Sequence, residues 1–172
     1  SQAQEFGTSH KISEPGAGSV QSTPTKYLFV GAPGYKSDTG RVYMYEWGIG
    51  ADGSTYDSWT QNLTISSNEP ATGKRFGHAI AANDNGDILA ISSQAPGKAG
   101  IVEIFRRTSQ SNDDSTNHSF TFVQTLSGIT ADGSSLNTKF GEALTMSKDG
   151  TTLVVGAPGY DNNNQADAGE WD

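Results

Sequence analysis

The chain has no cysteine among its 172 residues, and it has only 6 prolines and 3 histidines. Without cysteine it forms neither a disulfide nor a thiolate metal site. No apolar run approaches the roughly 20 residues that a membrane-spanning helix needs. No segment of useful length repeats apolar residues at the 3.6-residue period of an amphipathic helix. We therefore expect no membrane span, no disulfide framework and no helical fold.

The charge of the chain narrows the classes of partner. Its net charge is −8 at pH 7, because 19 Asp and Glu residues outnumber 11 Lys and Arg residues. Nucleic acids and anionic membranes attract basic surfaces, so we expect neither as a partner. Hydrophobic residues make up 33% of the chain, which also contains 21 glycines. This composition is typical of a fold with many turns.

The chain contains a repeat. "LFVGAPGY" (28–35) returns as "LVVGAPGY" (153–160), and "LAISSQAP" (89–96) lies almost midway between them. A Phe-Gly pair precedes each run, at 6–7, 76–77 and 140–141. We interpret residues 1–172 as a single domain fragment with units at about 5–74, 75–138 and 139–172, the last of them incomplete. The first residues resemble no signal segment, so the chain is expected to be mature or part of a longer protein.

Each unit has the pattern of four strands. The runs that end in Gly-Ala-Pro are continuously apolar, as in strands buried on both faces. The last strand of a unit alternates instead, as in a half-exposed edge strand. "WTQNLTI", from Trp59, matches "FVQTLSG", from Phe122. These two segments are separated by the same number of residues as the apolar runs of the first and second units. The side chains expected to share one face are Trp59, Gln61, Leu63 and Ile65 in the first unit, and Phe120, Phe122 and Leu126 in the second.

These features predict an all-β chain built from four-stranded antiparallel sheets. A repeated sheet of this size cannot bury both of its faces alone, so neighbouring sheets stack around an axis. The sequence therefore predicts a β-propeller sector of about three blades. It has fewer blades than the roughly four to eight of a closed propeller. Other blades or domains of a longer parent chain, or neighbouring copies, are the expected structural partners.

The three units resemble FG-GAP repeats. The pattern of Phe6-Gly7 with Gly31-Ala32-Pro33 recurs in the second unit as Phe76-Gly77 with Gln94-Ala95-Pro96. In the third unit it recurs as Phe140-Gly141 with Gly156-Ala157-Pro158. FG-GAP repeats build the seven-bladed propeller of integrin α-subunits, and this form is most similar to the variety in microbial surface and secreted proteins. The resemblance implies an extracellular or cell-surface protein. It also implies a structural or recognition role in which blades present loops to a protein or glycan.

Integrin-type repeats often carry a calcium loop with alternating Asp residues in the first hairpin, and this sequence departs from that pattern. Calcium binds several oxygen ligands. Only the turn of the second unit has a partial set of candidates: Asn83, Asp84, Asn85 and Asp87. A plain tight turn also favours Asn and Asp. A calcium-dependent adhesion module therefore stays an alternative to a metal-free one, and we expect no required cofactor.

No catalytic set is apparent. His10, His78 and His118 lie in unrelated places, and no nucleophile elbow, phosphate loop or zinc spacing is present. We expect the chain not to be an enzyme, with a propeller attached to a secreted hydrolase as the alternative. Two N-x-S/T sequons make Asn62 and Asn117 candidate glycosylation sites if the protein is made in a eukaryotic secretory pathway.

Overall fold

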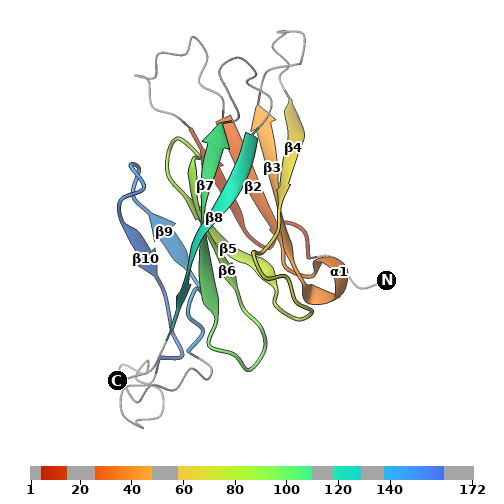
Figure 1. The fold of residues 1–172 in the computed structure, drawn as a ribbon, viewed down its shortest axis with the longest axis vertical. Helices are drawn as coiled ribbons and strands as arrows, with labels where there is room; N and C mark the ends of the chain where they lie inside the picture. The colour runs from red at the N-terminus through yellow and green to blue at the C-terminus, as the bar shows by residue number, and fades with distance from the viewer. Residues whose placement is uncertain (1–4, 15–25, 48–57, 110–117, 129–137, 161–172) are drawn as a thin grey trace.

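The computed structural model describes residues 5–14, 26–47, 58–109, 118–128 and 138–160. These residues form ten strands in three antiparallel sheets (Figure 1). The first sheet has the order β1 (His10–Ser13), β2 (Lys26–Ala32), β3 (Arg41–Trp47), β4 (Trp59–Ile65). The second has the order β5 (Phe76–Ala82), β6 (Ile88–Ser93), β7 (Ile101–Ser109), β8 (His118–Ser127). The third-unit hairpin consists of β9 (Leu144–Met146) and β10 (Leu153–Val155).

The prediction of an all-β chain with four-stranded antiparallel sheets is confirmed for the described residues. The runs that lead to Gly-Ala-Pro or its counterpart form β2 and β6, which are central strands, and β10. The strand β2 ends at Ala32, directly before Pro33, because proline has no N–H for a ladder. Among the described residues, helical structure is limited to the single turn α1 (Tyr35–Asp38). None of them belongs to a helix long and apolar enough to cross a membrane.

The outer strands β4 and β8 each contain a β-bulge, which overturns one prediction. Leu63 pairs with Met44, but Gln61 pairs with Tyr45, so Asn62 is the extra residue. An extra residue moves everything beyond it to the other face of the strand. Trp59 and Gln61 therefore lie on the face opposite Leu63, and the expectation that they share a face is wrong.

The second sheet has the same bulge. Ile104 pairs with Gln124 and Phe105 with Phe122, so Val123 is the extra residue. Phe122 consequently packs toward the first sheet and Leu126 toward the third-unit hairpin. When the outer strands are compared by their bulges and their partners on β3 and β7, Phe122 corresponds to Gln61. The match of Phe122 to Trp59, expected from the sequence, is therefore out of register.

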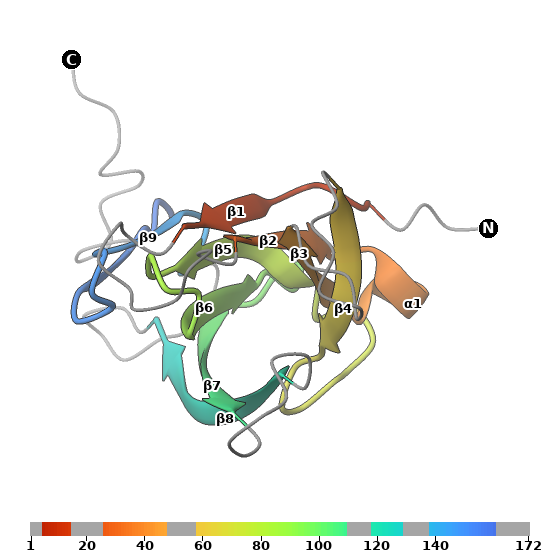
Figure 2. The same cartoon turned by 90° about the horizontal axis from the view of Figure 1, so that it is seen from above.

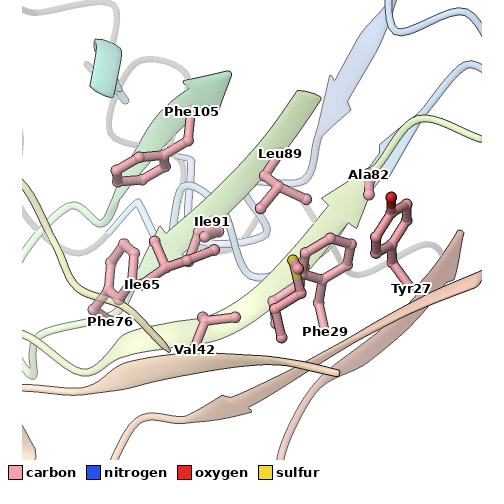
Figure 3. Close-up of a cluster of buried hydrophobic side chains, with 11 residues drawn as sticks. Tyr27, Phe29, Val42, Ile65, Phe76, Ala82, Leu89, Ile91 and Phe105 are labelled. Atoms are coloured by element: carbon pink, nitrogen blue, oxygen red, sulfur yellow. The ribbon is translucent and has the colours of Figure 1, made fainter. Parts of the chain in front are cut away.

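The main core lies between the first and second sheets (Figure 3). We call the face of a sheet that is turned toward the preceding unit its N-side face, and the opposite face its C-side face. The C-side face of the first sheet contributes Tyr27, Phe29, Val42, Met44 and Ile65. The N-side face of the second sheet contributes Phe76, Ile80, Ala82, Leu89, Ile91 and Phe105. Phe105 packs edge-on against Phe76, with ring centroids 5.9 Å apart.

A second core repeats this arrangement one unit later. The C-side face of the second sheet presents Ala81, Ala90 and Val102, all buried. Partly buried apolar residues pack against them, from both the second sheet and the third unit: Ile104, Leu126, Phe140, Leu144, Met146, Leu153 and Val155. Figure 2 shows the third-unit hairpin beside the second sheet, on the side away from β4. The described units therefore stack in sequence order.

The Phe-Gly turns have the same backbone conformation in all three units. The residue before each Phe has a positive φ: 50° at Glu5, 57° at Arg75 and 51° at Lys139. The glycine after each Phe has φ values of 88°, 91° and 87°. The glycine is also tied to its own unit, since the N–H of Gly7 donates to the carbonyl of Gly31 at 2.9 Å. Gly141 repeats this bond to Gly156 at 2.9 Å, so the two motifs of a unit form one local structure.

Candidate interaction surfaces

The described residues contain no group of three or more His, Asp or Glu side chains placed to hold a metal ion. His10 lies on β1 and His78 on β5, while His118, expected in a loop, begins β8. The Nε2 atom of His78 lies 3.4 Å from a carboxylate oxygen of Glu142. This contact joins the second sheet to the third unit, which gives His78 a place between repeats.

The candidate calcium turn is held together by its own hydrogen bonds. The side-chain oxygen of Asn83 accepts the N–H groups of Asp87 and Ile88, both at 3.0 Å. Its side-chain nitrogen donates to the Asp87 carboxylate. The Asp84 carboxylate lies 4.0 Å from the Lys148 ammonium, and the backbone carbonyl of Asn85 accepts a bond from Arg107. The Asn83 and Asp87 side chains thus meet each other, whereas Asp84 and Asn85 contact separate basic residues.

The corresponding turn of the third unit has the same construction with different residues. Ser147 occupies the place of Asn83, and its hydroxyl oxygen accepts the N–H of Thr152 at 2.9 Å. Asp149 inside this turn accepts bonds from the Ser147 hydroxyl and from the N–H and hydroxyl of Thr151. These three hydrogen bonds lower the pKa of Asp149 from 3.8 to about 2, and the bond from Ser147 has the largest effect. In both hairpins, therefore, a side chain caps the tight turn by accepting backbone N–H groups.

Of the two sequons, the structure describes one asparagine. Asn62 is exposed at the bulge of β4, an edge strand. Its side chain is therefore open to a modifying enzyme. Asn117 lies outside the described residues.

Glycines allow the units to approach one another closely. A Cβ atom at Gly40 would clash with the backbone of Phe76, and one at Gly100 would clash with the carbonyl of Phe140. At the same places the N–H of Phe76 donates to Thr39 at 3.2 Å, and that of Phe140 donates to Ala99 at 2.7 Å. The same kind of backbone contact thus joins the first unit to the second and the second to the third.

Equivalent positions differ in exposure between the middle and the two ends of the stack. Phe76, in the N-side face of the second sheet, is 0% exposed, whereas Phe6, at the same place in the first unit, is 56% exposed. In the C-side faces, Phe29 is 0% exposed and Val154, at the same place in the third unit, is 58% exposed. Among the described residues, no neighbouring unit covers these two end faces.

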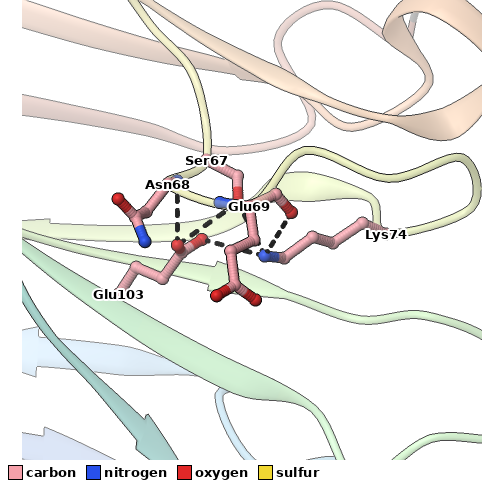
Figure 4. A network of polar contacts seen from close by, with 5 residues as sticks. All are labelled: Ser67, Asn68, Glu69, Lys74 and Glu103. Carbon is pink, nitrogen blue, oxygen red and sulfur yellow. Dashed lines mark hydrogen bonds and ion pairs between the residues drawn. The ribbon is translucent and has the colours of Figure 1, made fainter.

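A buried ion pair joins the segment between β4 and β5 to the second sheet (Figure 4). Glu103 on β7 is 1% exposed, and its carboxylate lies 3.6 Å from the Lys74 ammonium. The same carboxylate accepts the hydroxyl of Ser67 at 3.2 Å and the N–H of Asn68 at 3.0 Å. Sequence analysis missed this cluster, although a Glu between Val102 and Ile104 interrupts an apolar strand and could have indicated it.

A strained turn lies at the end of the strands where the Phe-Gly turns lie. Within α1, Lys36 (φ 48°, ψ 70°) and Ser37 (φ 57°, ψ 46°) have left-handed backbone conformations, which non-glycine residues rarely adopt in succession. The Arg41 guanidinium stacks over the Tyr35 ring at 4.1 Å. The N–H of Arg75 donates to the carbonyl of Asp38 at 2.7 Å, which fastens this turn to the second unit.

The sequence matches no family model, and no curated protein matches it either. The function of the chain is therefore inferred from the geometry of the described residues.

Proposed function

We propose that this chain is a sector of an FG-GAP-type β-propeller from an extracellular or cell-surface protein. The complete propeller would have seven blades, like the propeller of integrin α-subunits. Its role is structural or recognition: stacked blades hold loops that contact a protein or glycan within a larger assembly. The observation that supports this is the repeated inter-unit contact. Gly40 against Phe76 and Gly100 against Phe140 join successive units through the same backbone atoms.

The shape of the main core supports a propeller over a flat stack. Near β5 the sheets are separated only by glycine, since a Cβ at Gly77 would lie 2.8 Å from the Arg41 carbonyl oxygen. Toward β8 the space is filled by rings, with the Phe29 and Phe120 centroids 6.0 Å apart. Figure 2 shows β2 and β5 lying close together. A wedge of this kind fans sheets around an axis near their first strands.

The loops held by this scaffold support a recognition role. The turn α1 combines left-handed residues with the Tyr35–Arg41 stack, and it lies where two units meet. Strained backbone persists only where the surrounding structure holds it, and such positions concentrate at binding sites. Loops carried on a rigid scaffold are also the usual place for contacts with partners. We place the recognition surface at this end of the strands.

Three matched glycines test the repeated contact. Gly7, Gly77 and Gly141 share φ values of 88°, 91° and 87°, so replacement by alanine strains the backbone equally at each. Only the second and third face a neighbour: the new Cβ would lie 2.8 Å from Arg41 O at Gly77 and 2.8 Å from Ser92 Cβ at Gly141, with nothing within 4 Å at Gly7. We expect Gly77→Ala and Gly141→Ala to lower the free energy of unfolding by about 1–2 kcal/mol more than Gly7→Ala does. Denaturant titration measures this, and equal losses at all three positions would contradict the repeated contact.

A secretory origin predicts a glycan on Asn62. The bulge exposes this side chain on β4, which is an edge strand of the first sheet among the described residues. We expect intact-mass analysis of protein secreted from a eukaryotic host to show hexosamine-containing mass at Asn62, and Thr64→Ala to abolish it. Thr60→Ala, on the same strand but outside the sequon, is the control and keeps the glycan. Unmodified Asn62 in such a preparation would remove the support that this sequon gives to a glycosylated surface protein.

A further inference from the structure

The stack ends in two uncovered faces, the N-side face of the first sheet and the C-side face of the third unit. Both have the same residue pattern as the faces that pack together between units. At the N-side end, Phe6 and Ile12 are exposed, while their counterparts Phe76 and Ala82 are buried. At the C-side end, Val154 is exposed, while its counterparts Phe29 and Ala90 are buried. Each end therefore carries one half of an interface whose complete form exists twice within the chain.

The backbone repeats this pattern independently of the apolar side chains. A Cβ at Gly31 would clash with the carbonyl of Gly77 in the next unit, whereas one at its counterpart Gly156 would approach only Ala143 of its own unit, at 3.5 Å. A Cβ at Gly77 meets the Arg41 carbonyl, whereas one at Gly7 meets nothing within 4 Å. Both ends thus keep the glycine that close approach of another unit requires.

We propose that the N-side face of the first sheet binds the C-side face of the third unit of a second copy of this chain, head to tail. The inference rests on the proposed stacking of repeats. The chain itself carries both complementary faces, and the internal contacts show the kind of surface that each accepts. The N-side face belongs to a four-stranded sheet; with strands spaced about 4.8 Å and about seven residues long it presents roughly 400 Å² in projection. This is about half of what each partner of a standard interface buries. The described C-side face is smaller, because the third-unit hairpin has two strands of three residues each.

Two different faces that bind each other give a heterologous contact, which leads to chains or rings of copies. Each copy also carries a net charge of −8, so copies repel one another at low ionic strength. The Debye length falls from about 10 Å at 0.1 M salt to about 3 Å at 1 M. Association through apolar faces is therefore expected to strengthen as salt is added.

Complementation between two single variants tests the proposal. Phe6→Asp blocks the N-side face and Val154→Asp blocks the C-side face, and both positions are exposed, so each variant is expected to fold with an unchanged melting temperature. We expect sedimentation or light scattering to show concentration-dependent assembly of the unmodified chain and at least about tenfold weaker association of either variant alone. An equimolar mixture is expected to form a 1:1 dimer that does not grow further. Val123→Asp, at an exposed apolar residue away from both end faces, is the control and assembles like the unmodified chain.

Three outcomes would overturn the proposal. The unmodified chain remains a monomer at every concentration and salt; or one variant alone still dimerises, which indicates a face that pairs with itself; or the mixture stays monomeric. The comparison of Gly7, Gly77 and Gly141 tests contacts within one chain. Failure of assembly with those contacts intact therefore rejects docking between copies and leaves the stacked-repeat function standing.

Discussion

Replacing Phe76 with alanine is expected to lower the free energy of unfolding by about 3–5 kcal/mol. Its side chain is fully buried between two sheets and packs edge-on against Phe105. Removal deletes those contacts and leaves a cavity that packed strands cannot fill. For a domain of this size, a loss of that order lowers the melting temperature by about 10 °C. Denaturant titration and calorimetry in dilute solution measure both quantities.

The matched control for this change is the same substitution in the first unit. Phe6 has the same local backbone but is 56% exposed and contacts Tyr43 at a centroid distance of 5.6 Å. Phe6→Ala is expected to cost less than about 0.5 kcal/mol, as exposed positions usually do. Phe140, which is partly buried, should fall between the two. Similar losses for Phe6 and Phe76 would show that burial between units does not determine their contribution.

Replacing Lys74 with methionine is expected to destabilise the protein by about 3–5 kcal/mol, because it leaves the Glu103 carboxylate buried without its cation. Glu103 is 1% exposed, and Ser67 and Asn68 supply only neutral donors. The double variant Lys74→Met with Glu103→Met should recover most of the loss, since a buried ion pair and an apolar pair often differ little in stability. A double-mutant cycle on unfolding free energies measures the coupling.

The surface pair of Lys148 and Asp84 is the control for this cycle. Its atoms are 4.0 Å apart and the lysine side chain is 91% exposed, so Lys148→Met should leave stability unchanged within error. A Lys74→Met variant as stable as the parent would show that water or another cation reaches Glu103. An unrecovered double variant would show that shape at this place matters more than charge.

Local pattern was sufficient to predict the strands and their grouping. The apolar runs before Gly-Ala-Pro form β2, β6 and β10 because they are bounded by residues that end strands, Pro33 among them. The Phe-Gly and Gly-Ala-Pro motifs encode a backbone geometry that neighbours in the sequence largely determine. Both conclusions need only short segments of the chain.

Pairing between distant segments could not be predicted in the same way. An alternating pattern in β4 reads identically with or without a bulge, since the extra residue appears only when Gln61 is matched to Tyr45 on β3. The partner of Glu103 is likewise invisible locally, because Lys74 precedes β5 and the whole of β5 and β6 separates the two in sequence. Exposure likewise does not follow from the motif alone: Phe6 and Phe76 sit in the same motif, and only the units beside them make one buried and the other exposed.

The two bulges affect whether further strands can be added to the edges of the sheets. A regular edge strand offers an unbroken row of N–H and C=O groups, and another strand can extend it indefinitely. On β4 and β8 that row is interrupted at Asn62 and Val123, so an added strand keeps its register on only one side of the interruption. Extension along the hydrogen-bond direction is thus self-limiting at these two edges, which disfavours cross-β polymerisation through β4 and β8.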